Sequence, residues 1–218
     1  YRFIGWCREQ NCMPDFMNIH YYADIILPTS SDDFFLTKAT TSCFPKATDD
    51  FSLFIGGIKK IFKTMGVQDK PVYMTEWNFT MSHRNLISDT SFKTCYIMKN
   101  LLKNYDRLDS FCYWSLTDLI RENPLPPNQF HGGLGLYTSC GLRKGVFYVF
   151  YFANMLGDEL IAAGDGYFIT RKGDCYQIIT YHYIHYGDLF ASGELFDITE
   201  TNRYTAFDTT KDLDVSLQ

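Results

Sequence analysis

The 218-residue sequence contains no apolar run long enough to cross a bilayer and no dense cluster of basic residues. A membrane-spanning helix takes roughly 20 mostly apolar residues, and the first residues show no basic stretch followed by an apolar one. No membrane partner or signal peptide is therefore predicted. The formal net charge of −5 argues against a nucleic-acid surface, because phosphate binding calls for clustered Lys and Arg. DNA would be contacted only through a domain outside this chain.

The seven cysteines include no Cys-x-x-Cys pair, and their number is odd. They indicate neither a zinc site nor a complete disulfide framework, so a reduced, cytoplasmic protein is expected. Cys95 and Cys112 lie in apolar periodic segments and are expected to be small core residues. His182 and His185 alternate with tyrosines, but no third ligand is evident, so a solvated strand face is predicted there. Neither a metal site nor a cofactor is predicted.

What the sequence does contain is 46% hydrophobic and 17% aromatic residues, which is ample for a packed core. Helical periodicity or period-two alternation predicts helices at residues 2–11, 49–65, 90–105 and 144–156, and strands at 15–20, 72–76 and 110–114. This alternation of helices and strands is typical of βα units around a parallel sheet. We therefore predict an α/β fold for this part of the chain.

The pattern changes near residue 158. Beyond it, Gly-Asp-Gly and Lys-Gly-Asp turns separate period-two segments, which predicts antiparallel hairpins. We therefore predict two domains: a partial (β/α) barrel at residues 1–157 and a small antiparallel, β-sandwich-like domain at residues 158–218.

The most informative segment is KPVYMTEWN at residues 70–78, a buried-strand pattern that ends in a carboxylate, Glu76. In parallel α/β barrels, catalytic groups gather at the carboxyl ends of the strands. Trp77 and Asn78 flank this carboxylate, and an aromatic face and an amide suit the binding of a sugar. The segment thus predicts glycosidic chemistry. An ordinary loop glutamate paired with an arginine is the alternative, and this segment alone leaves both open.

The stretches PVYMTEWN, SFCYWSLTDLIRE and FHGGLGLYTSCGLRKGVFYVFYFANMLGDELIA resemble, in order and spacing, the C-terminal part of glycoside hydrolase family 39, the β-xylosidase family. Upstream, CREQNCMPDFMNIHYYAD resembles the family's helix-to-strand segment. The resemblance covers nearly the whole chain. It implies the C-terminal portion, about strands six to eight, of a TIM-type (β/α)8 barrel followed by a small antiparallel β domain.

Two further stretches, TEWNFTMSHRNLISDTSFKTCYIMKNLLKNYDRLDSF and HYGDLFASGELFDITETNRYTAF, resemble a subset of this family. In that subset the family 39 module is fused behind an AraC-type helix-turn-helix regulator. The resemblance implies binding of a xylose-containing oligosaccharide or a xyloside. Two functions stay open: a retaining β-xylosidase module, or a non-catalytic sugar-sensing effector domain of a transcription regulator.

Glu76 matches the nucleophile position of the family. Glu122 matches a residue that would hydrogen-bond sugar hydroxyls, although the neighbouring Arg121 departs from the family's usual glutamate and the NPLPPNQ insert differs too. A solvated loop carboxylate is the alternative for Glu122. Trp114 would stack on a sugar face or pack in the core.

The remaining predicted substrate-binding residues are His20 and Tyr22 at one strand end, and His131 and Gly132 in the FHGG loop. His20 would approach the nucleophile or a sugar hydroxyl, or act as a structural donor. The loop glycine would let the backbone approach a ligand closely or adopt a positive φ.

The resemblance also predicts what this chain lacks. The family's general acid/base glutamate follows an asparagine at an upstream strand, and the sequence contains no Asn-Glu pair. The chain alone is therefore expected to be inactive. Because an eight-stranded barrel takes about 250 residues, three strands leave an open sheet edge. We expect that edge to be buried by a second copy in a homo-oligomer, by a non-native pairing or by the β segment.

Overall fold

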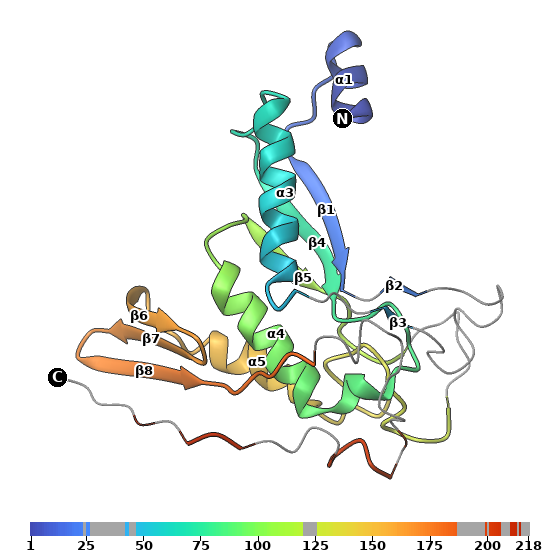
Figure 1. Cartoon of the computed structure of the whole chain (residues 1–218), viewed down its shortest axis with the longest axis vertical. Helices are drawn as coiled ribbons and strands as arrows, with labels where there is room; N and C mark the ends of the chain where they lie inside the picture. The colour runs from blue at the N-terminus through green and yellow to red at the C-terminus, as the bar shows by residue number, and fades with distance from the viewer. Residues whose placement is uncertain are drawn as a thin grey trace.

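The computed structural model describes residues 1–23, 25–26, 42–43, 47–119, 126–186, 199, 201–205, 210–212 and 214. Within these ranges the chain forms a three-stranded parallel sheet, a two-stranded pairing and a three-stranded antiparallel sheet (Figure 1). An N-terminal helix, α1 (Arg2–Glu9), precedes them. The fold class predicted from the sequence, part of a parallel barrel followed by a small antiparallel sheet, is confirmed.

The parallel sheet has the order β1 (Met17–Tyr22), β4 (Val72–Asn78) and β5 (Ser110–Tyr113). Helix α3 (Asp50–Thr64) leads into β4, and helix α4 (Ser91–Asn104) leads into β5. The predicted βα alternation is therefore present. Strand β1 begins and ends two residues later than predicted, β4 extends two residues further than predicted, and β5 stops one residue earlier.

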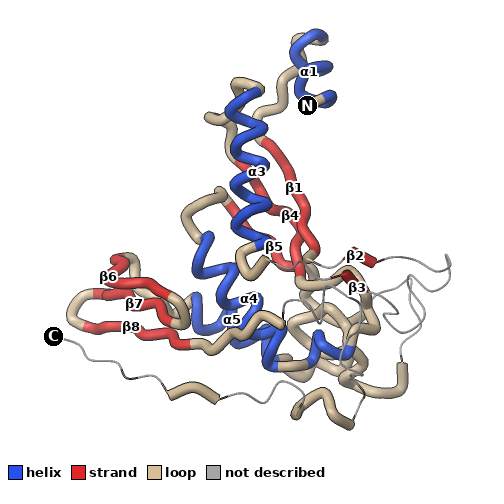
Figure 2. The backbone as a smooth tube through the Cα atoms, in the orientation of Figure 1, coloured by secondary structure: helices blue, strands red, loops and turns tan. Residues whose placement is uncertain are grey.

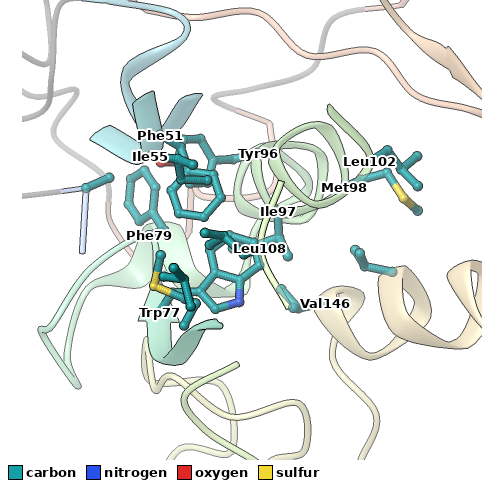
Figure 3. Close-up of a cluster of buried hydrophobic side chains, with 14 of the residues drawn as sticks. Phe51, Ile55, Trp77, Phe79, Tyr96, Ile97, Met98, Leu102, Leu108 and Val146 are labelled. Carbon is teal, nitrogen blue, oxygen red and sulfur yellow. The ribbon is translucent and has the colours of Figure 1, made fainter. Parts of the chain in front are cut away.

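The core lies between the sheet and the helices α3 and α4, which cover one of its faces (Figure 3). Phe51 and Ile55 of α3 and Tyr96 and Ile97 of α4 are fully buried there. Phe51 stacks on Trp77 of β4, with their ring centroids 4.9 Å apart. The opposite face of the sheet would be the inner wall of a complete barrel.

Residues on that opposite face are exposed or half-buried. Cys112 of β5 is one of them, which corrects the expectation that it is a core residue, while Cys95 is half-buried. Period-two alternation explains the difference, because Phe111 and Tyr113 on either side of Cys112 pack toward the hydrophobic core.

After the parallel sheet comes helix α5 (Gly145–Ala153), shorter than the predicted 144–156. The antiparallel sheet follows, with β6 (Glu159–Gly164), β7 (Tyr167–Lys172) and β8 (Cys175–Thr180) in sequence order (Figure 2). Two-residue strands β2 (Ile25–Ile26) and β3 (Ser42–Cys43) pair antiparallel beyond β1. A short 3-10 helix, η1 (Leu86–Asp89), precedes α4.

Candidate active site

Glu76 reaches the exposed face of the sheet because β4 carries a bulge. In the register with β1, Met74 pairs with Ile19, but the next pair is Glu76 with His20, which leaves Thr75 as an extra residue. A bulge interrupts the alternation of side chains between the two faces. Glu76 therefore lies on the same face as Thr75, and Trp77 returns to the core with Met74.

Two side chains of β1 contact the Glu76 carboxylate. The Tyr22 hydroxyl donates a hydrogen bond to Glu76 Oε1, and His20 Nδ1 lies 3.7 Å from Oε2. The Glu76 side chain is 24% exposed. The carboxylate is thus held by its neighbours and still reachable from solvent.

The other ring nitrogen of His20 faces Thr75 of the neighbouring strand. His20 Nε2 lies 3.0 Å from Thr75 Oγ1, and that hydroxyl donates a hydrogen bond to Asn18 Oδ1. These contacts orient the His20 ring beside Glu76.

Trp77 and Asn78 do not take part in this exposed site. The Trp77 ring is fully buried against Phe51, which contradicts its predicted contact with a sugar. Asn78 is also fully buried; its Nδ2 donates to the carbonyl oxygen of Trp114, and its Oδ1 accepts from Phe79 N at 2.6 Å. Asn78 therefore connects the ends of β4 and β5 instead of facing a ligand.

Trp114 follows β5 at the same end of the sheet and is 43% exposed. Its amide donates to the carbonyl oxygen of Trp77 at 3.1 Å, so the backbone is fixed while the indole faces outward. An exposed indole at this end of the strands suits stacking on a sugar ring. Glu122 and Arg121 lie outside the described residues.

The FHGG loop packs against the protein itself. His131 is buried, with Nδ1 3.1 Å from the carbonyl oxygen of Asn128. Gly132 has the expected positive φ, +83°, and a Cβ there would lie 2.4 Å from the backbone carbonyl carbon of Asn85. The close approach that requires a glycine is therefore to the Asn85 backbone and not to a ligand.

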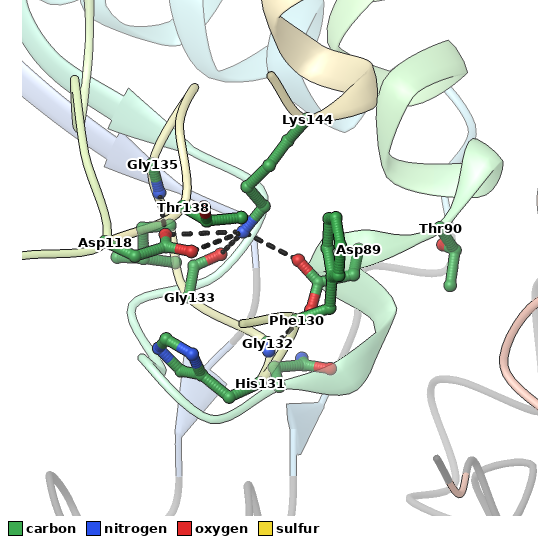
Figure 4. A network of polar contacts seen from close by, with 12 residues as sticks. Asp89, Thr90, Asp118, Phe130, His131, Gly132, Gly133, Gly135, Thr138 and Lys144 are labelled. Carbon is green, nitrogen blue, oxygen red and sulfur yellow. Dashed lines mark hydrogen bonds and ion pairs between the residues drawn. The ribbon is translucent and has the colours of Figure 1, made fainter. Parts of the chain in front are cut away.

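A buried ionic cluster anchors this loop (Figure 4). Lys144 Nζ lies 2.6 Å from Asp89 Oδ1, 3.1 Å from Asp118 Oδ2 and 2.7 Å from the carbonyl oxygen of Gly133. The two carboxylates also accept the amides of Gly132, at 2.6 Å, and Gly135, at 2.7 Å. We call Lys144, Asp89 and Asp118 the anchor cluster. No motif considered in the sequence pointed to it.

His83 is a second residue that sequence reasoning missed. It lies in the segment between β4 and η1, where burial, together with the positive charge of Arg84, lowers the pKa of His83 to about 4. The ring is therefore neutral at physiological pH. The sequence offered no signal for this, because burial in a loop leaves no periodic pattern.

The described ranges contain neither a metal-binding cluster nor a membrane-spanning helix. No group of three or more His, Cys, Asp or Glu side chains there is arranged to hold a metal ion. His182 and His185 follow β8 in irregular structure, which corrects the expected strand, and His185 Nδ1 lies 2.9 Å from the Tyr183 hydroxyl. None of the helices in those ranges combines the length and apolarity that a bilayer crossing requires.

A parallel βα sheet with a held carboxylate and an exposed indole at the carboxyl ends of its strands is the arrangement of barrel-type glycoside hydrolases. Comparison with known proteins agrees with this class. The sequence model of glycosyl hydrolases family 39 matches residues 1–180. The chain belongs to this family.

Two curated relatives are bacterial proteins named beta-xylosidase. That of Geobacillus stearothermophilus is 27% identical over 172 residues, which cover 79% of this chain and 33% of the relative. That of Caldicellulosiruptor saccharolyticus is 28% identical over 159 residues, which cover 72% of this chain and 30% of the relative. The chain thus spans about one third of the length of these relatives.

The fold is similar to that of a solved protein. The crystal structure of a monomeric beta-xylosidase from Caulobacter crescentus superposes with a TM-score of 0.73 at 24% identity. The match covers 84% of this chain and 36% of the other. At this identity the likeness shows the fold alone.

Proposed function

We propose that this chain is the C-terminal portion of a β-xylosidase-like module, supplying about strands six to eight of its barrel and the small β domain after residue 157. The site at the strand ends binds a xylose-containing oligosaccharide or a xyloside, with Glu76 as the nucleophile of a retaining mechanism. The observation that carries this proposal is the Glu76 carboxylate, turned to the open face by the bulge and held there by Tyr22.

In the proposed reaction, a Glu76 oxygen attacks the anomeric carbon while the bond from that carbon to the leaving oxygen breaks. The leaving oxygen takes a proton from a second carboxylic acid, which in retaining enzymes lies about 5–5.5 Å from the nucleophile. That second group then removes a proton from water, and the resulting hydroxide releases the sugar from Glu76. Because the sequence has no Asn-Glu pair, we assign the second group to a segment outside this chain.

The residues around Glu76 have separable roles in this proposal. The Tyr22 hydrogen bond restrains the carboxylate before attack. His20, 3.7 Å away, orients the other oxygen or a sugar hydroxyl. Trp114 provides the exposed ring on which the sugar stacks. Asn78 keeps the ends of the two strands in register without touching the sugar.

The alternative function is sugar sensing without turnover. It is favoured by the resemblance of two segments to modules fused behind AraC-type regulators. In this alternative the parent is a cytoplasmic transcription regulator, and DNA is contacted by a different domain. The same strand-end site would bind the sugar.

The test uses 2,4-dinitrophenyl 2-deoxy-2-fluoro-β-xyloside with the full-length parent, and with the chain alone for comparison. Dinitrophenolate leaves without a proton donor, so the reagent traps the nucleophile even where the acid is missing. Mass spectrometry is expected to locate one fluoroxylosyl group on Glu76 of the parent and none in Glu76→Gln. Binding of xylobiose without labelling would select the sensing alternative. Labelling at another residue, or neither labelling nor binding, would refute the proposed site.

A further inference from the structure

The anchor cluster by itself carries a net negative charge. The Asp89 and Asp118 side chains are 0% exposed and the Lys144 side chain is 1% exposed, so two carboxylates share one ammonium group out of contact with water. A buried charge without a counter-charge is strongly destabilising. Arg84 also interacts electrostatically with Asp118, whereas Asp89 faces a different second cation.

Arg203 supplies that cation from a distant part of the chain. Its Nη1 lies 3.7 Å from Asp89 Oδ2 and donates a hydrogen bond of 2.5 Å to the carbonyl oxygen of Phe130, at the start of the FHGG loop. Its side chain is 9% exposed. Lys144 and Arg203 thus both face Asp89, while Lys144 and Arg84 interact with Asp118.

A short hydrogen-bonded turn presents Arg203. Thr199 N donates to Asn202 Oδ1 at 2.7 Å, and Asn202 N donates to Thr199 Oγ1 at 3.2 Å. Arg203 N and Thr205 N then donate to the carbonyl oxygens of Thr199 and Asn202. The family model ends at residue 180, so this turn lies beyond the matched part of the chain.

The anchored loop is joined in turn to the strand ends. The carbonyl oxygen of Leu134 accepts from the Tyr113 hydroxyl at 2.8 Å and lies 3.4 Å from Asn78 Nδ2. Asn78 is two residues beyond Glu76 on β4 and also donates to the carbonyl oxygen of Trp114. A continuous set of contacts therefore runs from Arg203 through the loop to the candidate site.

We propose that Arg203 is a positioning residue: it supplies the buried Asp89 with a second cation and thereby holds the loop at residues 130–135 against the strand ends that carry Glu76 and Trp114. Its relevance to sugar binding rests on the proposed function. The positioning itself does not, and it can be tested on the chain without a ligand.

The experiment is hydrogen exchange of single amides, measured by NMR on the 218-residue chain. The amides of Gly132 and Gly135 report on the loop because they donate to the two buried carboxylates, and the amide of Trp114 reports on the strand end. In Arg203→Gln all three are expected to exchange at least about tenfold faster. The control is Arg171→Gln, which removes an exposed arginine paired with Glu159 and should leave these rates unchanged.

Two further variants separate charge balance from packing. Arg203→Lys keeps the positive charge and is expected to restore most of the protection. The double variant Asp89→Asn/Arg203→Gln leaves one acid and one base, so it should exchange more slowly than Arg203→Gln alone, which loss of arginine packing would not produce. Slower exchange in these two variants would also show that the fast exchange in Arg203→Gln does not come from poor folding of that variant.

Three results would overturn the proposal. The first is that the Gly132 and Gly135 amides exchange at the same rate in Arg203→Gln as in Arg171→Gln. The others are faster exchange of these amides with an unchanged rate at the Trp114 amide, or no slowing of exchange in either further variant. Xylobiose binding is measured separately by calorimetry. A wild-type parent that binds no xylobiose would refute the proposed function and leave the exchange results to decide the role of Arg203.

Discussion

Replacing Lys144 with methionine should cost more stability than any exposed charge in this chain. The substitution keeps most of the side-chain volume but removes the ammonium group that contacts both carboxylates, leaving Asp118 with the more distant Arg84 and Asp89 with Arg203, 3.7 Å away. Removing one partner of a buried ion pair costs about 3–5 kcal/mol, because the remaining charge stays desolvated. The free energy of unfolding of a domain is typically only about 5–15 kcal/mol, so the substitution should remove a large share of it.

Urea unfolding followed by tryptophan fluorescence measures this loss, since the Trp77 ring is stacked in the core and becomes solvated on unfolding. With an m-value of about 2 kcal/mol per molar urea, a loss of about 4 kcal/mol moves the midpoint down by about 2 M.

The matched control is Arg171→Met. It breaks the ion pair with Glu159, whose side chains are 42% and 53% exposed, and should cost about 0–1 kcal/mol. If Lys144→Met unfolds at the same urea concentration as Arg171→Met, the reasoning about the buried cluster is wrong.

Three further predictions follow from the site and its surroundings. The 218-residue chain alone should release no nitrophenol from 4-nitrophenyl β-xyloside, because an open barrel leaves the sugar unpositioned; turnover that Glu76→Gln abolishes would contradict this. Gly132→Ala should unfold at a lower urea concentration than Gly141→Ala. Both glycines have φ +83°, but only at Gly132 would a Cβ lie within 4 Å of other atoms, and overpacking costs about 1–3 kcal/mol. Equal unfolding midpoints would refute the steric argument. In the folded chain the pKa of His83 is lowered from 6.5 to about 4, so the unfolded chain binds the proton more readily. The contribution of His83 to the free energy of unfolding should therefore be full above about pH 6.5 and be lost as the pH falls toward 4. The fall should be shallower in His83→Asn, and an unchanged slope would count against this assignment.

Much of the fold followed from the sequence because its signals are local. Helical and period-two spacing located the helices α3 and α4 and the strands around them, with errors of a few residues at their ends. The sequence also predicted that Glu76 lies near the end of a buried strand. Each of these depends on neighbours within a few residues.

The orientation of the side chains around Glu76 could not be predicted from the sequence. Strict alternation would have placed Glu76 on the core side with Met74, and it is the bulge at Thr75 that sends Glu76 outward and Trp77 inward. The bulge depends on the pairing of β4 with β1, which lies more than fifty residues away along the chain. For the same reason Trp77 was wrongly predicted to contact a sugar.

The anchor cluster was hidden for a related reason. Its members lie on η1, in the segment after β5, and just before α5, and no spacing between them is characteristic of a motif. An aspartate or a lysine in a loop is usually solvated, so each residue separately suggested the surface. Only the three-dimensional arrangement shows that these charged side chains meet in the interior.

The turn at residues 199–205 changes where this module should be considered to end. A truncation after residue 180, where the family match stops, would retain every residue of the strand-end site and all three members of the anchor cluster. It would nevertheless remove Arg203, leaving the buried Asp89 with Lys144 as its one cation among the ion pairs described above. Boundaries drawn from sequence similarity would therefore yield a protein that contains the whole candidate site and yet folds less stably.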